Sequence, residues 1–119
     1  MAKNIIKLNR GDSCEFKVST NLSDTDVAYF ALLYPHQRFE DAILTKGYTI
    51  ADQIDENGNN TGEILIRIAP KDTTCLAPGI YYYTVKAYYG GTLNENDGSY
   101  ENAQEVYTIV ERTKFIINE

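Results

Sequence analysis

The sequence predicts an all-β sandwich of about seven to eight antiparallel strands, and three observations support this prediction. Apolar and polar residues alternate with a period of two along most of the chain, which is typical of strands with one buried face. Turn-forming residues separate these segments at intervals of about ten residues. The chain has 119 residues and 43% hydrophobic content, which suits one domain with its own core. Together these features favour a single immunoglobulin-like β-sandwich domain over residues 1–119.

The expected strands follow from this alternation. The clearest is the Tyr-rich segment, in which Tyr81, Tyr83, Val85 and Ala87 form a row that would face the core. The last part of the chain fits either two strands or one strand bent around residues 111–113. In chain order, the expected strands span residues 5–8, 14–19, 27–34, 43–50, 64–68, 81–87, 106–110 and 114–117.

Turn chemistry marks the connections between these strands. Arg10-Gly11-Asp12 predicts a tight turn after the first strand, because glycine accepts a positive φ and aspartate caps turns. Pro35-His36-Gln37 ends the third strand, since proline cannot continue a ladder. Residues 92–102 are polar and contain glycine, so we expect an exposed loop there. Helical content should be negligible, with one turn near Lys71–Thr74.

The charge pattern indicates which partners the chain does not take. It carries 17 acidic and 11 basic residues, a net charge of −6. Lys and Arg are scattered and the longest polar stretch, Asp52–Asn60, is acidic, whereas nucleic-acid-binding domains usually carry a basic stripe. No apolar run approaches the ~20 residues that cross a bilayer, and no signal-peptide core is visible. We therefore expect neither nucleic acid nor a membrane as a partner.

The sequence supplies few of the residues that build catalytic or metal sites. His36 is the only histidine, so a Ser-His-Asp or Cys-His arrangement would have to use it. Cys14 and Cys75 lie far apart in the chain, whereas zinc sites need clustered Cys and His. Residues 52–60 offer oxygen ligands but miss the calcium-loop spacing. We expect no enzyme activity, no cofactor and no metal ion, and we expect both cysteines to be free and mostly buried.

Ten tyrosines and no tryptophan favour a surface that meets a partner. A tyrosine combines an apolar ring with a polar tip and loses little side-chain entropy when it is ordered. Tyr82, Tyr88, Tyr89 and Tyr100 are the expected contact residues, at outward or loop positions. The alternative is that these side chains only pack on the exterior of the sandwich.

One segment carries a specific resemblance. Residues 69–83 include Pro70-Lys71-Asp72-Thr73, followed by Leu76-Ala77-Pro78-Gly79-Ile80-Tyr81-Tyr82-Tyr83. This segment resembles the Pro-x-Asp-Thr, Leu-x-Pro-Gly-x-Tyr-x-Tyr region of the N-terminal domains of phage baseplate upper proteins and related Ig-like virion modules. The opening Leu8–Ser13, with its Arg-Gly-Asp-Ser, and the ending 106–109 and 114–117 are similar to the first turn and the final strand of those modules.

The resemblance implies a virion protein that is assembled in the bacterial cytoplasm and binds other phage proteins of the capsid, tail or baseplate. It does not fix the position, so capsid decoration and a tail or baseplate accessory role both stay open, as does a homo-oligomer. A host-surface carbohydrate- or receptor-binding module is the alternative function.

Tyr81 has an expected role that does not depend on the resemblance. It follows Pro78-Gly79, where a tyrosine can bury its ring and return its hydroxyl to nearby backbone. We expect it to form such a tyrosine corner.

Overall fold

Nine of the twelve described elements are strands, which confirms the predicted all-β class. The structure is a computed structural model that describes residues 5–23, 26–93, 100–101 and 103–119, with only the backbone of Leu93 and Tyr100. In chain order the described elements are β1 (Ile6–Asn9), β2 (Cys14–Ser19), β3 (Val27–Leu33), η1 (Phe39–Asp41), β4 (Leu44–Tyr48), η2 (Ile50–Gln53), β5 (Glu63–Ile68), α1 (Pro70–Thr74), β6 (Gly79–Tyr89), β7 (Thr92–Leu93), β8 (Tyr100–Glu101) and β9 (Glu105–Asn118).

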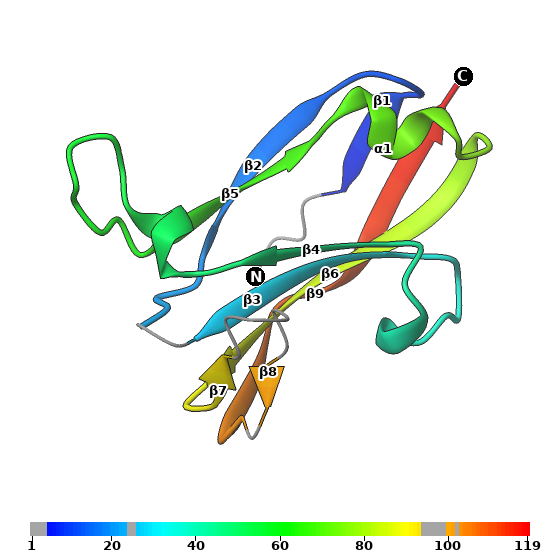
Figure 1. The fold of residues 1–119 in the computed structure, drawn as a ribbon. Coiled ribbons are helices and arrows are strands. Elements are labelled where there is room, and N and C mark those ends of the chain that lie inside the picture. Colours follow the sequence, from blue (N-terminus) through cyan, green and yellow to red (C-terminus); the bar gives the residue numbers. More distant parts are fainter. Residues whose placement is uncertain (1–4, 24–25, 94–99, 102) are drawn as a thin grey trace.

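The strands form two facing layers and a small hairpin. The larger sheet has the order β1-β9-β6-β3-β4, and the two-stranded sheet β2-β5 lies over one of its faces (Figure 1). The central order β9-β6-β3-β4 opposite β2-β5 is that of strands G-F-C-C′ opposite B-E in variable-type immunoglobulin sandwiches. One pairing departs from the expected antiparallel pattern, because β1 runs parallel to β9. Alternation reports which face of a strand is buried but carries no information about its partner.

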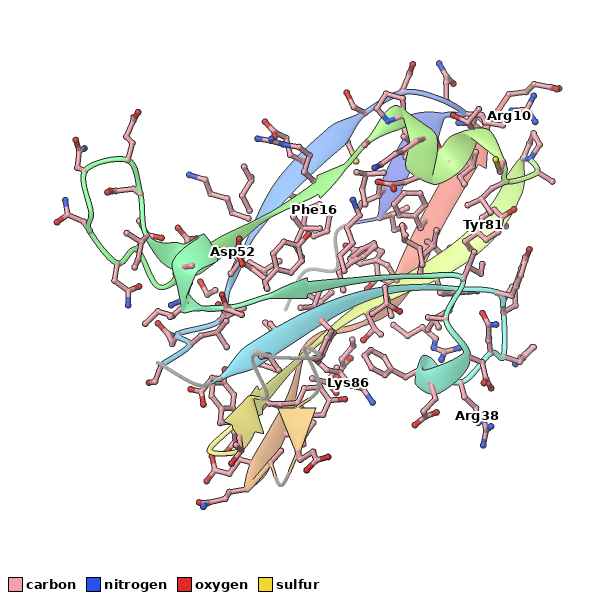
Figure 2. All side chains as sticks on the ribbon, viewed as in Figure 1. Arg10, Phe16, Arg38, Asp52, Tyr81 and Lys86 are labelled. Atoms are coloured by element: carbon pink, nitrogen blue, oxygen red, sulfur yellow. The ribbon has the colours of Figure 1, made fainter. Side chains whose placement is uncertain are left out.

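The core lies between the two sheets and is built on aromatic rings. The Tyr83 ring contacts those of Phe16, Phe30 and Phe115, with centroids 5.6, 5.9 and 6.2 Å away. Phe16 projects from β2 towards the larger sheet (Figure 2). The predicted inward row of β6 is confirmed, because all four of its side chains are buried. The alternation of β6 thus positions its other side chains on the opposite face of the sheet.

The end of the chain is one long strand rather than two. β9 pairs with β6 along its length, with register shifts opposite residues 83–86. At the irregularity, the Thr84 hydroxyl donates to the carbonyl oxygen of Val110 at 2.7 Å. Of the two expected forms, the bent single strand is therefore the correct one.

Three connections differ from the expected loops. The segment of residues 92–102 contains the β7–β8 pairing, in which Thr92 opposes Glu101, and residues 94–99 and 102 lie outside the described part. Two 3-10 helices, η1 and η2, join the single helical turn that we expected near Lys71–Thr74, which is α1. η1 follows the predicted turn of Pro35-His36-Gln37, and η2 begins at Ile50, where the expected strand of residues 43–50 would have ended.

Three of the four segments that carry the family resemblance, residues 8–13, 69–83 and 114–117, meet at one end of the sandwich. The fourth, residues 106–109, pairs with the other half of β6. The predicted turn at residues 10–12 is confirmed, because the Asp12 N–H donates to Asn9 O at 2.9 Å and Gly11 has a φ of +88°. The Gly11 N–H donates to the hydroxyl of buried Thr73 in α1 at 3.0 Å. The Arg10 N–H donates to Asn118 O of β9 at 2.7 Å. These motif residues therefore hold one another in place.

Tyr81 lies at the start of β6, at this same end. Its side chain is buried, and its hydroxyl donates to the carbonyl oxygen of Ala77 at 2.6 Å. Burial raises the pKa of this hydroxyl, and the neighbouring Tyr34 raises it further. The hydroxyl therefore stays protonated, as a donor, throughout the neutral pH range.

Replacing Tyr81 by phenylalanine is expected to lower the free energy of unfolding by about 1 kcal/mol, because the ring stays buried while the Ala77 carbonyl loses its donor. Urea denaturation of the two proteins measures the difference. Tyr34→Phe is the control, because the Tyr34 side chain is half exposed beside the Tyr81 ring. A Tyr81→Phe protein as stable as the wild type would rule out a structural role for the hydroxyl.

Candidate interaction surface

The candidate site is the face of the larger sheet that points away from β2 and β5, which we call the outer face. The strand registers place its side chains in cross-strand rows, such as Tyr29 opposite Lys86 and Tyr82 opposite Lys114. Its described members include Lys7, Val27, Tyr29, Ala31, Leu33, Thr45, Gly47, Ile80, Tyr82, Thr84, Lys86, Tyr88, Val106, Thr108, Arg112, Lys114 and Ile116.

Two of the four predicted contact tyrosines lie on the outer face. Tyr82 and Tyr88 are both half-buried rather than fully exposed. The ring of Tyr88 meets that of Tyr29 edge to face, with centroids 5.7 Å apart. Burial raises the pKa of Tyr88, and Tyr29 and the Glu40 carboxylate raise it further. These tyrosines therefore combine exterior packing with partial accessibility.

Tyr89 does not lie on the outer face. Its hydroxyl donates to the carbonyl oxygen of Thr20, and its ring contacts that of Tyr107 with centroids 5.7 Å apart. Successive side chains of a strand point to opposite faces, so Tyr88 and Tyr89 cannot both point outward. The alternation of side chains along β6 therefore assigns these two tyrosines to opposite faces of the sheet. Tyr100 pairs with Leu93 through the backbone, and its side chain lies outside the described residues.

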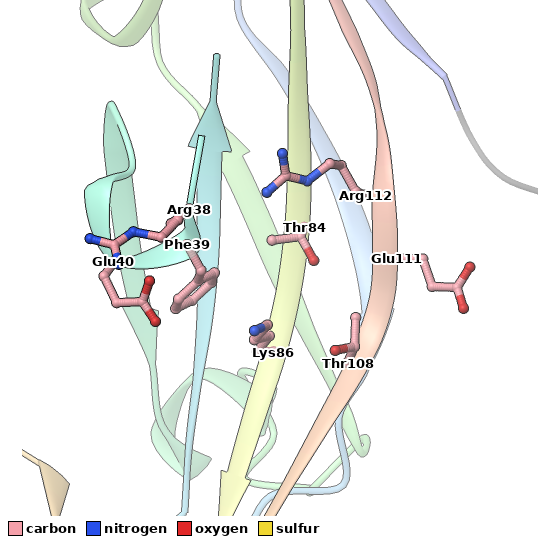
Figure 3. A pocket seen from close by; sticks show the side chains of 8 residues that line it. All are labelled: Arg38, Phe39, Glu40, Thr84, Lys86, Thr108, Glu111 and Arg112. Atoms are coloured by element: carbon pink, nitrogen blue, oxygen red, sulfur yellow. The ribbon is translucent and has the colours of Figure 1, made fainter. Parts of the chain in front are cut away.

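Sequence reasoning missed the hollow at the centre of the outer face. The loop that contains η1 lies beside β3, and the Arg112 guanidinium on β9 reaches it by donating to the carbonyl oxygen of Gln37. The resulting hollow has a volume of about 490 Å³ (Figure 3). Small-ligand sites in proteins span roughly 300–1,000 Å³. Its lining includes Arg38, Phe39, Glu40, Lys86, Thr108 and Arg112.

Lys86 is one of the residues that line this hollow. Its ammonium lies over the Phe39 ring, 4.7 Å from the centroid, and Figure 2 shows Lys86 on the side of the sheet nearest to η1. In the sequence Lys86 reads as an ordinary solvent-facing residue of an alternating strand. The residues that enclose it come from segments remote in the chain, so no local pattern could have indicated the hollow.

Exposed apolar side chains flank the charged centre of the outer face. Ile80, on β6, is 50% exposed, and Val106, on β9, is 49% exposed. Protein–protein interfaces combine apolar and polar contact areas, and aromatic residues and arginine are enriched in them. The outer face thus offers both kinds of contact.

The other sequence candidates serve local structure. His36 has a φ of +65° and is exposed in a turn that the Gln37 N–H closes by donating to Tyr34 O. In the loop of residues 52–60, the Asp55 carboxylate accepts hydrogen bonds from the N–H groups of Asn57 and Asn59. In the described part of the chain, no three His, Cys, Asp or Glu side chains group as metal ligands would.

Both cysteines are free, as expected, but their burial differs from the expectation. Cys14 is half-buried, and burial raises the pKa of its thiol, with a further rise from Glu15. Cys75 is exposed, because it ends α1 at the surface rather than pointing into the core. The expectation of mostly buried cysteines is therefore wrong for Cys75.

Comparison with protein-family models, curated proteins and solved structures finds no match to this chain. Among the described residues, no helix has the length and apolar character to span a membrane.

Proposed function

We propose that this chain is a non-enzymatic structural protein of a bacteriophage virion, an Ig-like module that binds other capsid, tail or baseplate proteins. The observation that carries the binding role is the outer face, which combines accessible aliphatic residues, tyrosines and a cationic hollow on the largest sheet. Regular sheets make rigid platforms, so a partner can dock there with little ordering cost.

The sequence resemblance supports the virion part of the proposal. Three of the four resembling segments, residues 8–13, 69–83 and 114–117, contact one another at one end of the fold, for example through Gly11 with Thr73 and the pairing of Tyr81 with Phe115. A shared pattern of interdependent residues is stronger support than the same number of unconnected matches. Assembly would take place in the bacterial cytoplasm, and capsid decoration and tail or baseplate service both fit.

A host-surface carbohydrate-binding role is the second candidate, and one observation favours it. The Tyr107 side chain is 53% exposed and its hydroxyl donates to the Glu105 carboxylate at 3.1 Å. An aromatic ring beside a hydrogen-bonding carboxylate can stack on a sugar and bind its hydroxyls. Binding on a glycan array that free sugar competes away, and that Tyr107→Ala abolishes, would favour this candidate over the first.

The virion role is tested by charging the outer face. Ile80→Glu places a carboxylate at an accessible apolar position. We therefore expect purified phage particles to contain about ten-fold less of the variant than of the wild-type protein, which corresponds to a loss of about 1.4 kcal/mol of binding free energy. Leu65→Glu is the matched control, since Leu65 is 36% exposed on the other sheet. Mass spectrometry of the particles measures both. Particles that lack the wild-type protein, or that incorporate both variants normally, would contradict the proposal.

A further inference from the structure

We infer that the hollow beneath η1 receives a carboxylate side chain from an acidic segment of a partner protein, which binds between Lys86 and Arg112. This inference rests on the proposed function and names the chemistry of the partner that docks on the outer face. It follows from the charges, the donors and the shape of the hollow.

The neighbours of Lys86 on the outer face of the sheet are uncharged. Its cross-strand neighbours are Tyr29 and Thr108, and its neighbours along the same face of β6 are Thr84 and Tyr88. Lys86 forms no ion pair within the described residues, although acidic side chains outnumber basic ones in the whole chain, 17 to 11. A half-covered ammonium without a counter-ion gains strongly from an incoming carboxylate.

Lys46 provides a contrast within the same sheet. It is also partly covered, with a side chain 24% exposed, and its ammonium lies 2.7 Å from the Asp72 carboxylate. The fold therefore supplies a partner for the covered lysine that faces the smaller sheet. It supplies none, in the described part, for the one that faces the hollow.

Arginine side chains supply further hydrogen-bond donors around Lys86. Arg112 uses one of its N–H groups on Gln37 O, and a guanidinium carries five donors. Arg38 also lines the hollow, but its side chain is paired with the Asp41 carboxylate at 3.2 Å. A carboxylate entering the hollow would meet Lys86 and the remaining donors of Arg112, which is a favourable set for charge-assisted hydrogen bonds.

The two acidic residues at the hollow do not occupy this position. Figure 3 shows the Glu111 carboxylate directed away from Lys86 and Arg112, beyond β9. The Glu40 carboxylate lies near enough to Tyr88 to raise the pKa of that tyrosine. The space between Lys86 and Arg112 is therefore flanked by cations, with the Phe39 ring as an apolar wall.

The charge of the whole chain favours a single carboxylate side chain over a long polyanion as the ligand of the hollow. The net charge of −6 repels an extended polyanion such as nucleic acid at long range. A single carboxylate in the hollow is governed by the charges within about one Debye length, roughly 8 Å at physiological salt. A protein segment with a protruding Glu or Asp, and apolar neighbours that meet Ile80 or Val106, fits both the charge and the surroundings.

The test uses the full chain and a short labelled peptide with glutamates at alternate positions, against the same peptide with glutamines. We expect the glutamate peptide alone to bind, more weakly as salt rises, and Lys86→Gln to reduce its affinity at least ten-fold. Lys17→Gln is the control, because Lys17 is an exposed cation on β2. Equal binding of both peptides, no binding, or an equal effect of Lys17→Gln would overturn the inference, provided that the melting temperatures match.

Competition with inorganic phosphate distinguishes a site for a carboxylate side chain from a site for any anion. Inorganic phosphate that binds as tightly as the glutamate peptide and displaces it would overturn the inference in favour of a general anion site.

Incorporation into phage particles separates this inference from the proposed virion role. Wild-type protein present in particles, with Lys86→Gln incorporated equally well, would overturn the inference and leave the virion role standing. If the wild-type protein binds the peptide but is absent from the particles, the virion role alone would be overturned.

Discussion

Replacing Gln53 by leucine is expected to lower the free energy of unfolding by about 3 kcal/mol. Gln53 is 1% exposed, at the end of η2. Its Oε1 accepts from the Thr20 hydroxyl and from the Leu22 N–H at 2.6 Å, and its Nε2 donates to Leu22 O at 3.0 Å. Leucine fills a similar volume but leaves these buried groups of the β2–β3 connection without partners, and each such group costs about 1–3 kcal/mol.

Urea denaturation measures this loss. Gln104→Leu is the matched control, because Gln104 is exposed and we expect that change to stay within about 0.5 kcal/mol. A Gln53→Leu protein within 1 kcal/mol of the wild type would show that water or a rearranged loop replaces the glutamine, and would contradict its role in fixing residues 49–62 to the sandwich.

Replacing Asp72 by asparagine is expected to cost about 2 kcal/mol at neutral pH. The Asp72 side chain is 7% exposed, and its carboxylate accepts from the Ala69 N–H and pairs with Lys46, which also donates to Arg67 O at 2.8 Å. These contacts link the edge of β4 to β5 and α1, so they join the two sheets on one side of the sandwich. Asparagine keeps an oxygen for Ala69 and removes the charge that Lys46 requires.

The same pair predicts the pH dependence. Burial alone would raise the pKa of Asp72, but the hydrogen bonds from Lys46 and Ala69 and the positive charges nearby hold it below its ordinary value. A carboxyl whose pKa is lower in the folded state contributes its full stability above the unfolded pKa of about 3.9, and loses that contribution as the pH falls through the folded value. The stability difference between wild type and Asp72→Asn should therefore shrink as the pH falls below about 4.

Denaturation at neutral and acidic pH measures the effect. Asp41→Asn is the control, because its pair with Arg38 is exposed and should contribute less than about 0.5 kcal/mol. A difference between wild type and Asp72→Asn that is constant with pH would contradict the ion pair as the source of the stability.

Much of the sandwich could be predicted because its determinants are local. Alternation identifies the buried row Tyr81 to Ala87, and glycine with aspartate identifies the turn at residues 10–12. Both signals depend only on neighbours in the chain. The parallel pairing of β1 with β9 could not be predicted in this way, because it depends on which strand lies alongside another in space.

The interior polar contacts show the same limit. Asp72 belongs to a recognisable Pro-x-Asp-Thr turn, yet nothing near it in the sequence indicates Lys46 as its partner. Gln53 sits in a polar segment that reads as a solvated loop, although its side chain is among the most buried in the protein. Long-range hydrogen bonds of this kind are set by the packing of the strands and not by any local periodicity.

The candidate site was predictable in part. The alternation placed Tyr82 and Tyr88 on one face, and the same rule, applied strictly, would have assigned Tyr89 to the other. The hollow depends on the position of residues 34–43 beside β3 and on the contact of Arg112 with Gln37 O. Composition predicts only a polar turn there, so the convergence of Lys86 and Arg112 becomes visible only in three dimensions.

The most direct test of the proposed role is a cryo-electron microscopy map of purified phage particles at side-chain resolution. The proposal predicts density for this sandwich at a repeated position, with the outer face around Ile80, Lys86 and Val106 against a neighbouring virion protein and a carboxylate of that neighbour between Lys86 and Arg112. Particles without this density, or a sandwich attached through β2 and β5 with the outer face open to solvent, would contradict it.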